Sequence, residues 1–464
     1  MSPRLLIVLI TAFACKGESS DRSAPPPPVQ QPAKPMKFIG DPCKTATLHG
    51  TFAWIEDDYP RALACAKSKN LPLVLDLWAP WCHTCLSMQS TVFTDRTFEP
   101  DAAKFVFASL DTDREANADA VAQYPLSAWP TFYVVSPDEA VLARFVGAAS
   151  VSQFHGFLDT GARARAGGTE GPDAHLLAAE RARALKDNAT AEKELVAALA
   201  AAPATWPRKP DALVSLVGIR RKLGDISGCI DLTERSLDET GNTASASDFL
   251  FLGLECAAER DKADPDRVKK LRERAVARLQ KLVADPNAPL SVDDRSDAMG
   301  NLRAILDTLG NNAAAKAVAE QQRTLLDAAA AKATSPMVAM TYNWPRAEVY
   351  VYLGRPLDLV PALEQSAKGL PNEYDPRARL GWLLFKADKL DEAVKWTDEA
   401  LKLVYGPRKA RVLTQRAEIA NKQGDRAAEK LYRQELVKLL EALPVSQVQS
   451  DEIVKAKQAV ANLE

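Results

Sequence analysis

The stretch that decides the fold of the first half of the chain is LVLDLWAPWCHTCLSMQ, residues 73–89. It places Cys82 and Cys85 shortly after a nearly continuous apolar run, 73–79, which is typical of a strand buried on both faces. Helical spacing follows from Cys82 to about residue 93. Two cysteines at this spacing form a redox pair, half of a metal site or a structural disulfide, and the rest of the chain must distinguish these.

Thiol–disulfide exchange needs an attacking thiolate and a second thiol close enough to resolve the mixed disulfide. A helix N-terminus lowers the pKa of a cysteine, so we expect Cys82 to be an exposed nucleophile in the first turn and Cys85 to be more shielded. A zinc site would need two more ligands, and only the isolated Cys43 and Cys65 lie in the same region, so no metal is expected. A disulfide across so short a loop is usually redox-active.

The segments around this motif alternate between helices and strands. Helices are expected at residues 59–70, 82–93, 114–124 and 150–164, and strands at 73–79, 104–111, 131–136 and 141–146. Four residues connect the last two strands, as in a hairpin. This order predicts an α/β domain over residues 38–166, a mixed sheet flanked by helices.

The flanks of the motif resemble a known family. WAPWCHTC, 78–85, resembles the thioredoxin signature, and AWPTF, 128–132, resembles the loop that holds a cis-proline in thioredoxins. Over about 50–160 the chain looks most like thioredoxin-like domains of the exported, membrane-linked DsbD type. The resemblance implies the thioredoxin fold and disulfide exchange with protein thiols, in which Cys82 attacks and Cys85 resolves. It implies no cofactor, because the electrons reside on the cysteine pair.

The resemblance also assigns roles to residues near the pair. Asp76, six residues before the first cysteine, falls where thioredoxins keep a buried aspartate that relays the proton of the resolving cysteine. Trp81, Trp129 and Pro130 are expected to bind substrate, with the backbone of Trp129 pairing with a substrate strand. Gly147 matches a family glycine near the active-site face.

The chain departs from the thioredoxin pattern between its cysteines. Thioredoxin has Gly-Pro there, whereas this chain has His83 and Thr84, and this dipeptide tunes the reduction potential. A histidine can stabilise the thiolate, but strongly oxidising relatives place histidine second, so the direction of exchange stays open. Ser109 stands in the place of a thioredoxin lysine that pairs with the buried aspartate.

The rest of the chain has a helical composition. Residues 167–172, GGTEGP, are a linker, and residues 173–464 resemble tetratricopeptide (TPR) repeats, helix–turn–helix units of about 34 residues. The clearest unit is 378–403, in which Gly381 lets a second helix approach. We therefore predict an all-α, TPR-like solenoid, with a generic helical bundle as the alternative. The region 285–345 fits the repeat poorly.

The N-terminal segment points to export. Residues 1–14, MSPRLLIVLITAFA, have one arginine and a short apolar run, as in a secretory signal. Cleavage after Ala14 would leave Cys15 to be lipidated, as in a bacterial lipoprotein, although a plain secretory signal also fits. Residues 15–37 are polar and proline-rich, as in a semi-extended spacer. We expect an exported, periplasm-facing protein, lipid-anchored to a bacterial membrane.

The cysteine count indicates candidate disulfide pairs, and the net charge argues against one class of partner. With Cys15 lipidated, six of the seven cysteines remain, and Cys43 with Cys65 and Cys229 with Cys256 are candidate pairs that sequence alone does not assign. The 59 basic and 61 acidic residues give a net charge of −2, so no basic excess favours nucleic acid.

Two functions fit this sequence. The leading hypothesis is an exported thiol–disulfide oxidoreductase that acts on protein thiols and disulfides and draws electrons from a membrane or soluble thiol donor. Its repeats would bind a protein partner through their concave face. The alternative is a TPR scaffold or assembly adaptor, in which the thioredoxin fold is a binding platform of little turnover.

Overall fold

The computed structural model describes residues 40–463 of the chain. The expected signal at 1–14, the lipidation site Cys15 and the spacer 15–37 lie outside these residues. Within the described part, no helix combines the length and the apolar character needed to cross a membrane.

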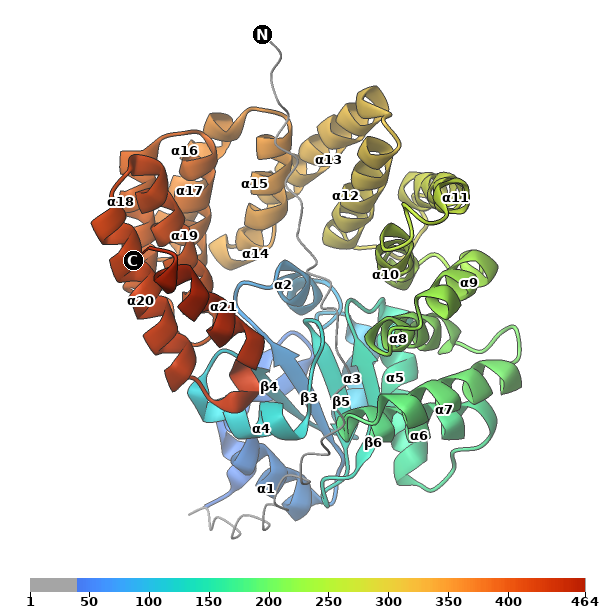
Figure 1. The fold of residues 1–464 in the computed structure, drawn as a ribbon. Coiled ribbons are helices and arrows are strands. Elements are labelled where there is room, and N and C mark those ends of the chain that lie inside the picture. Colours follow the sequence, from blue (N-terminus) through green and yellow to red (C-terminus); the bar gives the residue numbers. More distant parts are fainter. Residues whose placement is uncertain (1–39, 464) are drawn as a thin grey trace. The chain divides into compact units, whose positions relative to one another are not determined.

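A mixed six-stranded sheet forms the centre of the first domain (Figure 1). The strand order is β1-β2-β4-β3-β5-β6, in which β2, β4 and β3 are parallel and the other pairings are antiparallel. The strands are β1 (Thr47–His49), β2 (Phe52–Glu56), β3 (Leu73–Trp78), β4 (Val106–Asp111), β5 (Thr131–Val135) and β6 (Val141–Val146). The predicted mixed sheet is confirmed, and β1 and β2 are additions to it. All three residues of β1 are exposed, so its sequence has no apolar alternation from which the strand could be predicted.

Helices pack on both faces of this sheet. They are α1 (Tyr59–Lys69), α2 (His83–Ser90), α3 (Glu99–Ala102), α4 (Ala118–Gln123) and α5 (Val151–Arg165). Successive residues of β3 serve opposite faces: Val74 joins an aromatic cluster with Phe132 and Phe154, whereas Leu75 joins a cluster with Tyr133. The central strands are therefore buried on both sides, as their continuous apolar sequence predicts.

The second domain consists of helices that follow one another in chain order (Figure 1). They are α6 (Gly171–Ala184), α7 (Asn188–Ala201), α8 (Lys209–Lys222), α9 (Ile226–Ser236), α10 (Ala244–Ala258), α11 (Pro265–Ala284), α12 (Val292–Thr308), α13 (Asn312–Lys332), α14 (Pro336–Met340), α15 (Asn343–Tyr352), α16 (Val360–Gly369), α17 (Asp375–Lys386), α18 (Leu390–Leu401), α19 (Arg408–Gln423), α20 (Arg426–Ala442) and α21 (Ser450–Ala461). Neighbours pack as pairs, such as α6 with α7 and α17 with α18. Helix α6 begins inside the expected linker, because Pro172 is accepted in a first helical turn.

Glycines bring paired helices together at two places. A Cβ atom on Gly381 of α17 would lie 2.3 Å from Oγ1 of Thr397 in α18, so the role predicted for Gly381 is confirmed. Gly253 of α10 stands in the same relation to Thr233 of α9, at 2.2 Å. The region that fits the repeat poorly contains the 21-residue α13 and the five-residue α14, whose unequal lengths break the period.

Candidate functional site

The two cysteines lie where β3 leads into α2. Cys82 is the N-cap residue of α2, and its Sγ accepts a hydrogen bond from the backbone N–H of Cys85 at 3.1 Å. The two cysteines are joined in a disulfide. The unpaired N–H groups at a helix N-terminus favour negative charge on a group in this position. A thiolate on Cys82 would therefore be stabilised by the start of the helix.

Both cysteines are buried, and the expectation of an exposed Cys82 is wrong. Cys82 is 5% and Cys85 2% exposed. The rings of Trp81 and Trp129 pack beside them, with centroids 4.9 Å apart. Sequence reasoning placed Cys82 on an open surface because it considered the first domain alone, whereas α2 packs against α12 and α14 of the repeats.

Two arginines of the repeats contact Trp81. The guanidinium carbon of Arg408 lies 4.4 Å from the centroid of its indole ring, and Nη2 of Arg379 donates to its carbonyl oxygen at 3.5 Å. Its Nε1 donates to Asp113 at 2.8 Å. Burial and the nearby charge of Asp111 raise the pKa of Asp113 to about 7. The rim of the cysteine pair is thus built from both domains.

Asp76 is buried at the centre of the sheet. It lies in β3, paired in register with Ser109 of β4, and it is 2% exposed. Its Oδ1 has no hydrogen-bond partner. Burial raises the pKa of Asp76 to about 8, and Ser109, its partner in register, carries no positive charge that could offset this effect. A carboxyl group with a pKa near neutrality is suited to accept and return a proton.

The loop before β5 forms the other wall of the site. The peptide bond between Trp129 and Pro130 is cis. Nε1 of Trp129 donates to Oγ1 of Thr112 at 2.8 Å, and the N–H of Gly147 donates to the carbonyl oxygen of Pro130 at 2.9 Å. Gly147 has a φ of +86°, a conformation that favours glycine. These contacts fix the loop against the strands that carry it.

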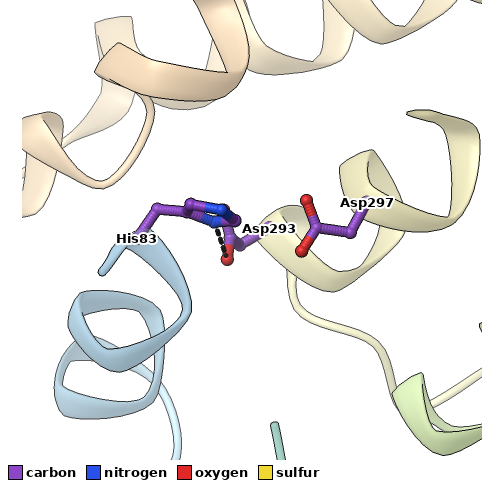
Figure 2. A group of neighbouring side chains, drawn as sticks. All are labelled: His83, Asp293 and Asp297. Carbon is purple, nitrogen blue, oxygen red and sulfur yellow. Dashed lines mark hydrogen bonds and ion pairs between the residues drawn. The ribbon is translucent and has the colours of Figure 1, made fainter. Parts of the chain in front are cut away.

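The side chain of His83 points toward Asp293 and Asp297 of the repeats (Figure 2). Its Nδ1 lies 2.9 Å from both carboxylate oxygens of Asp293, which is in the first turn of α12. Burial by itself would lower the pKa of His83, but Asp293, and then Asp297, outweigh it and raise the pKa to about 10. His83 therefore carries a positive charge at neutral pH.

One ligand atom each from His83, Asp293 and Asp297 lies within 4.8 Å of the others, a separation that a cation could bridge. The hydrogen bonds of Nδ1 to Asp293 describe a different arrangement, a protonated imidazole beside two carboxylates. The zinc ligand set considered from sequence is excluded for another reason, because Cys43 and Cys65 form a disulfide with each other. Cys229 and Cys256 form a further disulfide between α9 and α10.

Sequence reasoning missed every contribution of the repeats to this site. Asp293 is 210 residues from His83, and Arg379 is 298 residues from Trp81. Asp293 and Asp297 are four residues apart on one helical face, but this spacing is common on solvated helices and nothing in it points to His83.

Comparison with known proteins finds a family match in the first part of the chain. Residues 54–137 match the model of the family described as thioredoxin-like. No curated protein matches.

Several solved structures are similar to the helical part at low identity. A TPR protein from Parabacteroides merdae is 15% identical, with a TM-score of 0.40, over 63% of this chain and 99% of that chain. YrrB, described as a TPR protein with an unusual peptide-binding site, is 14% identical, with a TM-score of 0.25, over 49% and 97%. PilF of Pseudomonas aeruginosa is 15% identical, with a TM-score of 0.28, over 54% and 96%.

The family match, the mixed sheet and the paired helices agree on the architecture. The chain carries a thioredoxin-like domain followed by TPR-like helical repeats.

Proposed function

We propose that the protein is a thiol–disulfide oxidoreductase that exchanges disulfides with protein substrates through Cys82 and Cys85. One observation carries the proposal: the Sγ of Cys82 caps the N-terminus of α2, with the second cysteine three residues on and bonded to it. This geometry supplies both an activated nucleophile and a resolving thiol.

In the reducing direction, the Cys82 thiolate attacks one sulfur of a client disulfide. A bond forms between Cys82 and that sulfur, and the client's other sulfur leaves as a thiolate. Cys85 then loses its proton and attacks Sγ of Cys82, which releases the client's second thiolate. Two electrons pass from the pair to the client, and an external dithiol donor must restore them.

Two ionisable groups support these steps. Asp76 would accept the proton of Cys85, since its pKa of about 8 leaves it partly ionised near neutral pH. The positive charge of His83, one residue after the nucleophile, would favour the Cys82 thiolate. Asp293 draws this charge toward the repeats, so the second domain is expected to modulate the potential of the pair.

We further propose that the protein works outside the cytoplasm, lipid-anchored through Cys15. The disulfides Cys43–Cys65 and Cys229–Cys256 support this location, because such bonds persist in oxidising compartments. The repeats would bind a protein partner, either a client or an electron donor on the membrane.

The reduction potential of the Cys82–Cys85 pair in the intact protein tests the proposal. The protein is equilibrated in glutathione or dithiothreitol redox buffers, free thiols are alkylated, and the peptide that contains both cysteines is quantified by mass spectrometry. A reversible two-electron transition is expected. A value near about −270 mV would identify a reductase and a value near about −120 mV a disulfide donor. The absence of reversible exchange would refute the proposal.

A scaffold is the second candidate, and the 5% exposure of Cys82 favours it. In that case the thioredoxin-like domain would be a platform whose cysteines stay bonded beneath the repeats. The double variant Cys82→Ser/Cys85→Ser separates the two candidates in cells that depend on the protein. Full function in that variant would support the scaffold, and loss of function would support the enzyme.

A further inference from the structure

A cavity of about 650 Å³ lies beside the cysteine motif. Thr84, Trp129 and Gly147 of the thioredoxin-like domain form one wall, and residues of α8, α10 and α12 form the other. Its volume is within the range of ~300–1,000 Å³ that is typical of ligand pockets. Ser127 and Ala128, which also line it, are exposed, so the cavity communicates with solvent along the proline loop.

The repeat wall of this cavity carries four carboxylates, from Asp248, Glu259, Asp294 and Asp297. Asp248 lies close to Gly147, on the proline-loop side of the cavity. A Cβ atom added to Gly147 would lie 3.2 Å from Oδ2 of Asp248. Asp297 lies near His83 of the cysteine motif, in the group that Figure 2 shows. The acids therefore flank the space between the cysteine motif and the loop.

Asp248 and Asp297 differ from Asp294 in their hydrogen bonds, and Asp297 also lies near the charged His83. Asp294 closes the capping box of α12, accepting from the N–H of Ser291 at 2.9 Å. Within the described part of the chain, neither Asp248 nor Asp297 forms a hydrogen bond or an ion pair. Burial, followed by the charge of Asp294, raises the pKa of Asp248 to about 7, which reflects the missing cation.

Three basic residues line the cavity, and two of them have partners in the protein, whereas Lys222 is exposed to solvent. Arg183 bonds Ser215 at 2.7 Å, and Arg221 pairs with Glu255 at 2.5 Å. Phe251 also lines the cavity, and it is 46% exposed although it is a large apolar side chain. The cavity thus offers an apolar surface beside Asp248, which has no ion-pair partner in the described part of the chain, and Asp297, whose charge is shared with His83.

We propose that this cavity binds an extended client segment in which a lysine or arginine directly flanks the reacting cysteine. The cation would lie between Asp248 and Asp297, and an apolar neighbour would pack on Phe251. The inference rests on the proposed exchange activity and names the substrate class for it. The repeats would then select clients at the active site itself.

Single-turnover kinetics test this inference. The intact protein is pre-reduced, freed of reductant and mixed with disulfide-linked dimers of Ala-Lys-Cys-Phe-Ala, Ala-Glu-Cys-Phe-Ala, or an isomer with the lysine four residues from the cysteine. The first peptide is expected to react roughly tenfold faster than either of the others. In the variant Asp248→Asn/Asp297→Asn that advantage should fall to less than about threefold. Asp307→Asn, on α12 but outside the cavity, is the matched control and should keep the full advantage.

The outcomes separate this inference from the exchange activity. If glutathione disulfide and all three peptides react at the same rate, exchange stands and the inference is overturned. If nothing reacts, the proposed function fails as well. Stabilisation of the protein by Zn²⁺ or Mn²⁺ alone, lost in Asp297→Asn and without peptide selectivity, would assign the acids to a metal ion and overturn the inference too.

Discussion

The disulfides Cys82–Cys85 and Cys229–Cys256 are both buried, yet their surroundings differ. Cys229 and Cys256 are 0% exposed and lie in the apolar cluster shared by the first repeats, with Ile230 and Phe249. Cys82 and Cys85 are almost as buried, but Asp76, Asp113 and His83 lie around them with shifted pKa values, and a cavity adjoins them. Burial therefore does not distinguish the pair that is proposed to react from the other pair. The ionisable groups and the adjoining cavity distinguish the two pairs.

Replacing each pair by serines gives the largest expected contrast. Cys82→Ser/Cys85→Ser should reduce disulfide exchange with a peptide to the uncatalysed background. Cys229→Ser/Cys256→Ser should keep the exchange rate but lose ~2–4 kcal/mol of stability, because that disulfide restrains the unfolded chain. Stopped-flow exchange assays and urea denaturation measure the two effects. If Cys82→Ser/Cys85→Ser still catalysed exchange, the two disulfides would not differ in reactivity as proposed.

The variant Asp76→Asn tests the buried acid beside the reactive pair. The pKa of Asp76 is about 8 in the folded protein and about 4 in an unfolded chain, so the folded state binds this proton more tightly. The contribution of Asp76 to stability is therefore most favourable below pH 4 and decreases up to pH 8, by up to about 1.4 kcal/mol per pH unit.

Asp76→Asn should lack this pH dependence and be the more stable protein at pH 9, by up to about 5 kcal/mol. Its resolving step should slow, since the proton acceptor is gone. Urea denaturation at pH 5, 7 and 9 measures the first effect, with the exposed Asp138→Asn as control. Parallel stability profiles for the wild type and Asp76→Asn would contradict the assignment.

The variant Gly406→Ala tests whether the repeats limit access to Cys82. A Cβ atom on Gly406, in the loop before α19, would lie 1.9 Å from the backbone oxygen of Asp113. The loop must therefore move away from the cysteine motif, at a cost of ~1–3 kcal/mol. Alkylation of reduced Cys82 should become faster.

Gly424→Ala is the matched control, because Gly424 also has a positive φ, +76° compared with +57°, but has no atom within 4 Å of the added methyl group. Equal alkylation rates in the two variants would show that this loop does not cover the cysteine.

The smallest expected effect is that of Asp293→Asn. Without the carboxylate, burial should bring the pKa of His83 well below its value of about 10, which NMR titration of the imidazole measures. A histidine with a raised pKa stabilises the fold fully below its unfolded value of about 6.5, and this contribution is lost as the pH rises to about 10. The stability deficit of the variant should therefore be greatest near pH 6 and disappear near pH 10. A deficit that does not vary with pH would mean that the pair is not ionic.

Most helices and strands of the first domain could be predicted from local sequence. The apolar run before Cys82, the proline loop and the hairpin strands each have a pattern that one segment contains, and the structure places them within a few residues of expectation. The three exposed residues of β1 have no such pattern, so that strand could not be found.

The site was predictable only in part, for a physical reason. Asp76, Cys82 and Cys85 lie within ten residues of one another, and local spacing brings them together. Asp293 beside His83 and the two arginines beside Trp81 come from helices hundreds of residues away, and only the packing of the repeats places them. The burial of Cys82 was mispredicted for the same reason.

The distance in sequence between His83 and Asp293 has a consequence for how the protein matures. A chain is synthesised from its N-terminus, and domains tend to fold in that order. The cysteine motif is thus complete while α12, α17 and α19 have not yet been made. For that interval the nascent chain presents an uncovered thiol pair, which any oxidant or thiol nearby can reach. In a chain that folds in this order, the repeats cover the pair last.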